Sequence, residues 1–393
     1  MVEKGKGKEL MDALIVGCGL TGSVIARELA EHGKQVVVLE KRDHIGGHMY
    51  DYTEEHGFLV QKYGPHAFHT TKEELYEYMC QYEEWQPYNL MCGADWDGRC
   101  TPTPFNFKTI DTFYNVSDAE RIKEKLTEAF PGRETVTVVE VLEHSDSDVR
   151  GYAEFLFRND YAPYTAKQWG IAPSEIDPSV LKRVPLRFSY GEGYFDDEYQ
   201  VMPVHSFTKF FENLLNHPNI KIELGVDAMG RLSVLGDALL VDGVKVDFPV
   251  IYTGALDELF EGKFGWLPYR SLRFEWKYAD IEGLQEYPVV AYPKEDYTRI
   301  TEFKKIPPQD KRGTIYAEEY PLPYTEGAKN EPYYPVLTEH SQQQYEQYKE
   351  LANRIPNLFC CGRLADFKYY NMDQALERAL AVAYALVMEE TGE

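Results

Sequence analysis

Short apolar runs separated by an amphipathic stretch mark the first forty residues of this chain. Residues 14–16 and 36–39 are apolar runs of the length expected for buried strands. The residues between them have a helical period, so a β-α-β unit is predicted. Strand patterns return much later, at residues 220–224, 238–241, 244–246 and 250–254. Asp242-Gly243 predicts a hairpin turn between two of these strands.

Helical patterns dominate the section between the two groups of strands. Residues 70–179 are predicted to form a mainly helical insert. Within it, Thr70 to Glu74 and Ser117 to Glu120 have the pattern of capping boxes that begin helices. Another helix is predicted over residues 206–217, where Pro218 closes it.

The last third of the chain changes character twice. Residues 269–323 are rich in aromatic, β-branched and proline residues without a helical period, which predicts an antiparallel sheet. Residues 357–361 then form an apolar run, and a helical pattern begins at about residue 373. A strand, a glycine and a helix at this end would complete the sheet that the first residues begin.

The turn after the first strand contains closely spaced glycines. Gly17, Gly19 and Gly22 have the G-x-G-x-x-G spacing, with Leu20 and Thr21 between them. This spacing allows a tight turn, a close approach to a pyrophosphate and close packing of the next helix, whose N-terminal N–H groups face the phosphates. Glu40 ends the second strand, where a carboxylate can accept hydrogen bonds from a ribose. The pattern predicts a bound dinucleotide, and a plain turn is the alternative.

The next residues favour FAD over NAD. Lys41 and Arg42 follow the acid, and Gly46-Gly47 lets the chain pass close to a cofactor without a Cβ atom between them. This extension resembles FAD proteins of the glutathione-reductase type. The alternative is a surface turn after a strand.

These elements predict an α/β fold with α+β insertions. A Rossmann-like FAD-binding domain is expected from residues 1–78, 201–262 and 342–393. A helical domain is expected at residues 79–181. An antiparallel sheet domain is expected from residues 182–200 and 263–341.

Composition restricts the partners. Lys and Arg number 41 against 65 Asp and Glu, a net charge of −24, which disfavours nucleic acids and anionic membranes. The six cysteines have no C-x-x-C spacing, and no segment has the pattern of a signal peptide or membrane span, so a soluble cytoplasmic protein is expected. His66-x-x-His69 lacks the H-E-x-x-H pattern, and we expect no metal site.

Several further segments resemble the UDP-galactopyranose mutase family of bacterial type. They occur in the family's order, nearly from end to end: Tyr63-Gly64-Pro65-His66, Tyr164-Thr165-Ala166-Lys167-Gln168-Trp169-Gly170, Tyr252-Thr253-Gly254-Ala255-Leu256-Asp257, Tyr269-Arg270-Ser271-Leu272-Arg273-Phe274 and residues 362–373. The resemblance implies an isomerase that interconverts UDP-galactopyranose and UDP-galactofuranose without net redox change. It further implies reduced FAD, whose N5 atom is the nucleophile at C1 of the sugar, an external reductant such as NADPH or NADH, and a homodimer.

The resemblance also assigns residues. Arg183 and Arg270 match two arginines that hold the pyrophosphate, which suits the planar fork of a guanidinium group; a surface salt bridge is the alternative for Arg183. Tyr164, with Trp169 nearby, matches a stacking face for uracil, although two aromatic residues in a helical core would look the same. His66 matches a loop beside the flavin ring, or it is a structural histidine. The remaining substrate contacts implied are Tyr194, Tyr320, Tyr369 and Asn371. The remaining FAD contacts implied are His48, Tyr63, Gly64, Arg363, Met372 and Asp373.

Two departures from the family pattern affect specificity. Residues 202–208 stand where the family usually has Gly-Tyr-Thr, and Ala162-Pro163 precedes Tyr164 where an asparagine is usual. Strict galactose specificity is therefore less firmly implied than the type of reaction. The rival hypotheses are an FAD-dependent oxidoreductase of the amine-oxidase type and a nucleotide-binding protein without catalytic activity.

Overall fold

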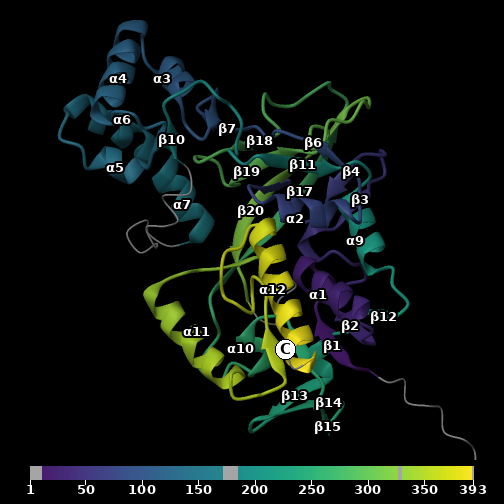
Figure 1. Cartoon of the computed structure of the whole chain (residues 1–393). Helices are drawn as coiled ribbons and strands as arrows, with labels where there is room; N and C mark the ends of the chain where they lie inside the picture. Colours follow the sequence, from purple (N-terminus) through teal and green to yellow (C-terminus); the bar gives the residue numbers. More distant parts are fainter. Residues whose placement is uncertain (1–10, 171–184, 326–329, 392–393) are drawn as a thin grey trace, which may run out of the picture.

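The computed structural model describes residues 11–170, 185–325 and 330–391 (Figure 1). At its centre is a sheet of five parallel strands in the order β12-β2-β1-β16-β22. The strands are β1 (Ala13–Val16), β2 (Val36–Glu40), β12 (Ile220–Leu224), β16 (Val250–Tyr252) and β22 (Leu358–Cys360). The sheet thus combines strands from both ends of the chain, and the predicted Rossmann-like α/β fold is confirmed.

Two helices from opposite ends of the chain pack together on this sheet. Helix α1 (Leu20–Glu31) follows β1, and α12 (Met372–Thr391) lies beside it (Figure 1). Helix α9 (Phe207–Leu215) also contacts α1 and buries Phe207, Phe210 and Phe211. Burial of these side chains is the main force that joins the three distant segments.

A second sheet has seven strands in the order β21-β17-β20-β19-β18-β7-β8. Its members are β7 (Cys92–Trp96), β8 (Arg99–Thr103), β17 (Tyr269–Ala279), β18 (Val289–Ala291), β19 (Arg299–Glu302), β20 (Thr314–Pro323) and β21 (Tyr334–Pro335). All neighbours are antiparallel except β7 and β18, which are parallel. The antiparallel strands predicted at residues 269–323 are confirmed.

Apart from α2 (Glu73–Cys80), the predicted helical insert is helical only from residue 107 onward. Its first part contains β7 and β8, joined by Asp97-Gly98, both of which have positive φ angles (58° and 80°) as a tight hairpin requires. The sequence signal for β8 is weak because Pro102 breaks the strand pattern. An edge strand tolerates such a proline, and β8 is at the edge of its sheet.

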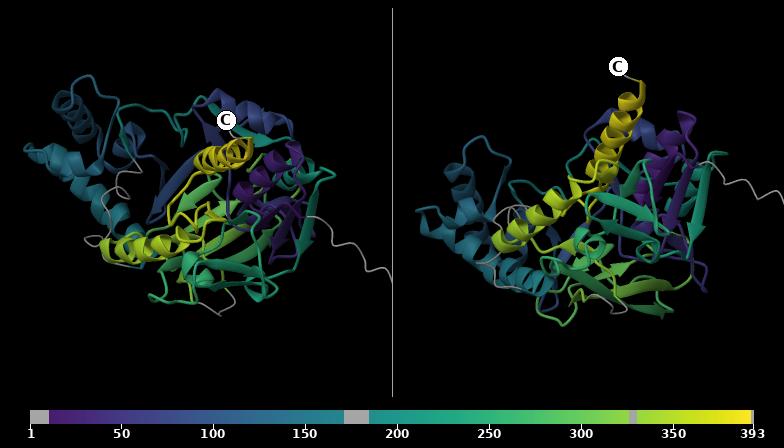
Figure 2. Two further views of the ribbon diagram at one scale, coloured as in Figure 1. Left: turned by 60° about the horizontal axis from the view of Figure 1, so that its bottom comes forward. Right: turned by 90° about the horizontal axis from the view of Figure 1, so that it is seen from below.

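The helices of the insert form a lobe with its own apolar core (Figure 2). They are α3 (Phe107–Phe113), α4 (Val116–Ala129), α5 (Val138–Leu142), α6 (Ser147–Leu156), one π-helical turn η2 (Phe157–Tyr161) and α7 (Ala162–Trp169). The predicted capping box at Ser117 is wrong, because α4 begins two residues earlier and Asn115 accepts the N–H of Asp118. The box at Thr70 is also wrong: Lys72 precedes α2 (Glu73–Cys80) without a side-chain cap.

Smaller elements connect these parts. They are η1 (Gly47–Met49), β3 (Asp51–Thr53), β4 (Leu59–Gln61), β5 (Phe68–Thr70), β6 (Trp85–Pro87), β9 (Thr135–Val136), β10 (Leu186–Arg187), β11 (Tyr199–Pro203), η4 (Ala228–Gly230), β13 (Leu232–Leu235), β14 (Ala238–Val241), β15 (Val244–Lys245), α10 (Leu256–Leu259) and α11 (Glu339–Ala352). Strands β14 and β15 form the hairpin predicted at Asp242-Gly243. Among the described residues, no helix is long and apolar enough to cross a membrane.

Asp51 joins β3 to the start of α9. Its side chain is 2% exposed, and its carboxylate oxygens accept the N–H groups of Phe207 and Thr208, each at 2.8 Å. Burial raises the pKa of Asp51, and its hydrogen bonds with Thr208 partly oppose that rise. The carboxylate therefore satisfies N–H groups at the helix N-terminus, which have no partner within the helix.

Asp51→Ala should lower the free energy of unfolding by about 2 kcal/mol, because two buried N–H groups lose their acceptor. Urea denaturation followed by circular dichroism would measure the change. Ser206→Ala, which removes only the partly exposed cap that accepts the N–H of Lys209, is the matched control and should cost about 1 kcal/mol. Equal losses for the two variants would contradict the role given to Asp51.

Candidate functional site

The turn between β1 and α1 is built for close backbone contact. A Cβ atom on Gly17, where φ is +98°, would lie 2.1 Å from Oγ1 of Thr253, and one on Gly22 would lie 2.0 Å from the carbonyl oxygen of Gly17. A Cβ atom on Gly47, where φ is +55°, would lie 2.9 Å from Cα of Gly19. Side chains at these positions would therefore force the two segments apart. The glycines leave a cleft over the N-terminus of α1, which fits the pyrophosphate of a dinucleotide.

The cleft contains most of the residues predicted to bind the cofactor. Those that line it are Gly17, Gly19, Leu20, Thr21, Gly22, Glu40, Lys41, Arg42, Gly46, Gly47, His48, His66, Arg363 and Met372. Asp373 lies next to Met372 at the start of α12, and its Oδ1 atom is buried without a hydrogen-bond partner. Tyr63 lies farther along, in the adjoining cavity.

Glu40 is held within a network of its own at the ribose end of the cleft. One carboxylate oxygen accepts the N–H of Cys18 at 2.8 Å, and the other accepts the N–H of Arg42 at 3.0 Å. The guanidinium group of Arg42 pairs with both Glu40 and Glu331. Burial disfavours the charged form of Glu331, but His48 and Arg42 outweigh burial and lower its pKa. Arg42 therefore links the strand β2 to the segment before β21.

His66 stands where the cleft meets a second cavity. Its Nδ1 atom lies 2.8 Å from the carbonyl oxygen of Gly64, and Gln61 bonds both its N–H and its carbonyl group. Burial lowers the pKa of His66 to about 3, and the charge of Arg363 adds to that decrease. The ring is therefore neutral at pH 7. Because a carbonyl oxygen only accepts, Nδ1 carries the proton and Nε2 is an acceptor.

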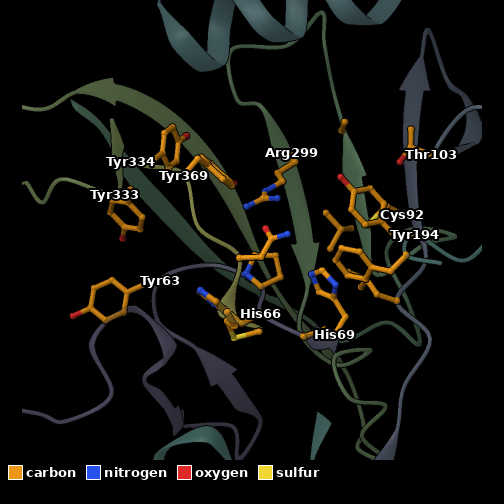
Figure 3. A pocket seen from close by; sticks show the side chains of 18 of the residues that line it. Tyr63, His66, His69, Cys92, Thr103, Tyr194, Arg299, Tyr333, Tyr334 and Tyr369 are labelled. Carbon is orange, nitrogen blue, oxygen red and sulfur yellow. The ribbon is translucent and has the colours of Figure 1, made fainter. Parts of the chain in front are cut away.

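The second cavity lies between the seven-stranded sheet and the helical lobe and is lined by aromatic side chains (Figure 3). The predicted site residues that line it are His48, Tyr63, His66, Tyr164, Tyr194, Arg363, Tyr369, Asn371 and Met372. His69 also lines it, and its Nδ1 atom lies 2.9 Å from a carboxylate oxygen of Asp197. Six residues line both the cleft and this cavity: His48, His66, Tyr333, Arg363, Asn371 and Met372. Cleft and cavity are thus parts of one site.

Arg299 is the main residue that the sequence analysis missed. It begins β19, and its guanidinium group lies between Tyr334 and Tyr369 on one side and Tyr194 on the other (Figure 3). Its Nε and Nη2 atoms each lie 2.9 Å from a carboxylate oxygen of Glu319. Burial disfavours its charge, but the charge and hydrogen bond of Glu319, together with the effects of Tyr164 and Tyr334, outweigh burial and raise its pKa. A fixed cation therefore lies in an aromatic cavity.

Comparison with known proteins assigns the family. The sequence model described as UDP-galactopyranose mutase matches residues 159–369, more than half of the chain, and an NAD(P)-binding Rossmann-like domain matches residues 15–82. The UDP-galactopyranose mutase of Mycoplasma pneumoniae is 34% identical over 384 residues, which is 96% of each chain. This chain belongs to the UDP-galactopyranose mutase family.

Other relatives extend the comparison. A dTDP-fucopyranose mutase of Escherichia coli is 35% identical over 374 residues, 94% of this chain and 97% of that protein. A crystal structure of reduced UDP-galactopyranose mutase has the same fold, with a TM-score of 0.73, 16% identity and coverage of 98% of this chain and 95% of that one. The UDP-galactopyranose mutase resemblance and the prediction of an isomerase are confirmed.

Two residues expected to contact substrate in this mutase family point elsewhere. Arg270 is 8% exposed, and its guanidinium group donates to the carbonyl oxygens of Gln168 at 2.8 Å and Lys167 at 3.3 Å. It therefore holds the C-terminal end of α7 and is not among the residues that line the cavity. Tyr320 donates to Glu318 at 2.9 Å, beneath the guanidinium group of Arg273, and also lies outside the cavity lining.

Two further expectations of the mutase assignment are not decided by these contacts. Arg183 lies outside the described residues, and Trp169 ends α7.

All six cysteines have free thiols, and burial raises the pKa of Cys18 to about 12. Among the described residues, no group of three or more His, Cys, Asp or Glu side chains could hold a metal ion.

Gly47→Ala should abolish dinucleotide binding, because its Cβ atom would press on Gly19 at a backbone conformation that alanine rarely adopts. The measurement is the amount of nucleotide released from the purified protein on heating, determined by chromatography. Gly151→Ala is the matched control, since a Cβ atom there meets nothing within 4 Å. If the Gly47→Ala protein released as much dinucleotide as the wild type, the close contact between Gly19 and Gly47 would not be required for dinucleotide binding.

His66 should remain neutral as the pH falls from 8 to 5, because its pKa is lowered to about 3. Nitrogen NMR of protein labelled at histidine would follow the ring, and His66→Gln would identify its resonances. The urea-unfolded protein is the reference and should titrate near pH 6.5. A midpoint near 6.5 in the folded protein would show that the ring is not desolvated as described.

Proposed function

We propose that this protein interconverts UDP-galactopyranose and UDP-galactofuranose. The single observation that carries the proposal is the joining of a dinucleotide cleft to an aromatic cavity whose described lining includes the partly buried guanidinium groups of Arg299 and Arg363. The family membership supports the same reaction. A nucleoside diphosphate sugar has an aromatic base, an anionic pyrophosphate and a polar hexose, and each of these parts has a chemical counterpart in the site.

The residues of the cleft fit FAD. The glycine cradle accepts a pyrophosphate, and the shared lining around His66 and Met372 leaves the far end of the cofactor facing the cavity. Reduced FAD, when bound, would supply N5 as the nucleophile at C1 of the sugar, in place of any side chain. An external reductant such as NADPH or NADH would be required to reach this state.

The chain's own residues would bind and orient the sugar nucleotide. Arg299 would hold the pyrophosphate as it leaves and returns, together with Arg183, which the resemblance pairs with Arg270 at that group, since a guanidinium fork matches phosphate oxygens in pairs. Tyr164, with Trp169 near it in sequence, would stack on the uracil. Asn371 and the acceptor Nε2 of neutral His66 would contact the sugar at the junction with the cleft. Tyr194 and Tyr369 would add hydroxyl groups around the pyrophosphate.

A second substrate deserves equal testing, because one relative at 35% identity is a dTDP-fucopyranose mutase. Fucose lacks the C6 hydroxyl of galactose, and thymine carries a methyl group that uracil lacks. Both sugars would undergo the same change of ring size. We expect UDP-galactose to be preferred, because three of the relatives are named as UDP-galactopyranose mutases or a probable one.

The decisive experiment incubates the purified protein with UDP-galactofuranose or dTDP-fucofuranose, with and without dithionite, and separates the products by chromatography. Conversion of UDP-galactofuranose to the pyranose form only after reduction is the expected result. Conversion of the dTDP sugar alone would transfer the proposal to that substrate. Conversion that does not depend on dithionite would show that the reaction needs no reduced cofactor. Oxidation of an amine in a parallel incubation without sugar nucleotide would favour the oxidoreductase alternative.

Arg299→Lys should lower kcat/KM about 100-fold, because lysine offers a point charge where a paired guanidinium contact is needed. Arg273→Lys is the matched control: Arg273 is in the same sheet, lies over Tyr320 and does not line the cavity. Steady-state kinetics on reduced enzyme would measure both variants. Equal activity of the Arg299 variant and the wild type would exclude a substrate contact by Arg299.

We also expect a homodimer, which light scattering after gel filtration would test.

A further inference from the structure

Asp160 is a buried acid in the cavity to which the reaction as proposed gives no role. It lies in the π-helical turn η2, four residues before Tyr164, and both residues line the cavity. Its side chain is 9% exposed, and its Oδ1 atom is buried without a hydrogen-bond partner. An unpaired buried carboxyl oxygen is costly, and the cavity that Asp160 lines is where a bound ligand can supply the partner of Oδ1.

The surroundings of Asp160 raise its pKa, so that about half of its carboxyl groups are protonated at pH 7 and most at pH 6. Burial raises its pKa to about 7, against the opposing effects of the indole N–H of Trp96 and the charge of Lys167. Lys167 is committed elsewhere, because its ammonium group donates to the carbonyl oxygens of Tyr292 at 2.8 Å and Tyr297 at 2.9 Å. The other titratable neighbours are Tyr161 and Tyr164, and burial raises the pKa of both phenols.

A protonated carboxyl group has one donor and one acceptor side by side. The imide edge of uracil or thymine has the complementary pair, an N3–H donor beside a carbonyl acceptor. Two relatives are named as a UDP-sugar mutase and a dTDP-sugar mutase, and the bases of these two nucleotides, uracil and thymine, both have this edge. A base stacked on Tyr164 would lie beside Asp160, because four residues along a helix bring two side chains to the same face.

We propose that Asp160 is a specificity-determining residue that reads the pyrimidine base of the substrate, through a two-point hydrogen bond between its carboxylic acid and the imide edge. The proposal rests on the nucleotide-sugar substrate proposed above. In this arrangement, the Oδ1 atom of Asp160 gains a hydrogen-bond partner only when substrate is bound. It also explains how one cavity accepts either uracil or thymine, since the two bases share this edge.

The test compares the binding of UDP and 3-methyl-UDP to the holoenzyme by titration calorimetry. Methylation removes the N3–H donor and leaves the diphosphate unchanged. Wild type should bind UDP at least 10-fold more tightly than 3-methyl-UDP, whereas Asp160→Leu should bind UDP more weakly and lose most of this preference. Asp160→Asn should keep the preference, because an amide also presents one donor beside one acceptor.

The pH dependence adds a second readout. The ratio of the two affinities should fall for wild type as the pH rises from 6 to 8.5, since a carboxylate cannot donate to the base, and it should stay constant for Asp160→Asn. Glu154→Gln, at an exposed position of α6, is the control and should leave the ratio as in wild type. Titration of the phosphate cancels in the ratio because both ligands carry it.

Two outcomes would overturn the proposal. If Asp160 serves only the indole N–H of Trp96, Asp160→Leu would lower thermal stability and retain the preference for UDP. If Asp160→Leu does not fold, a preference that stays constant with pH in the wild type would still refute the proposal. Failure of UDP to bind wild type, with Arg299 intact, would instead refute the nucleotide-sugar substrate itself. The failure of the two proposals can therefore be distinguished.

Discussion

The close backbone contact between Gly19 and Gly47 is the constraint on which the site depends. It brings the turn after β1 against the segment after β2, so that η1 begins beside the N-terminus of α1. His48 follows within η1 and stacks on Tyr333, with 4.4 Å between ring centroids. The path of the chain from the cleft to the aromatic cavity is therefore set by two residues without side chains.

The second sheet contributes the charge of the site. Arg299 and Glu319 come from the neighbouring strands β19 and β20, and their pairing offsets part of the cost of removing a guanidinium group from water. Pairing with one carboxylate still leaves other N–H donors of the guanidinium group for an anion. In a chain with a net charge of −24, such a local cation is what an anionic substrate requires.

The parallel core could be predicted because its signals are local. The glycine spacing, the apolar runs of β1 and β2 and the final strand and helix each lie within a short window, and the structure joins them as expected. The family assignment also followed from such short segments. The capping boxes failed for the opposite reason, since Asn115 and Ser117 both offer a cap and packing of α4 decides between them.

The arginine of the cavity could not be predicted from local pattern. Arg270, Arg273 and Arg299 all lie in strands of one sheet, and the register of those strands puts Arg273 on the face opposite Arg299. Arg270 is on the same face as Arg299 but donates to carbonyl groups at the end of α7. The same alternation places Glu319 toward Arg299 and the adjacent Tyr320 against Arg273. Long-range pairing, which a single sequence does not reveal, therefore separated the residues that touch the cavity from those that support it.

The contacts around α7 have a mechanical consequence. Arg270 fastens the end of this helix to β17, and Lys167 fastens it to the segment between β18 and β19. The helical lobe is thus held beside the cavity, while α4 lies at its distant end (Figure 1). Asp160 and Tyr164 lie close to these contacts, whereas α4 lies far from them. A tilt of the lobe about α7 would therefore move α4 much farther than Asp160 and Tyr164.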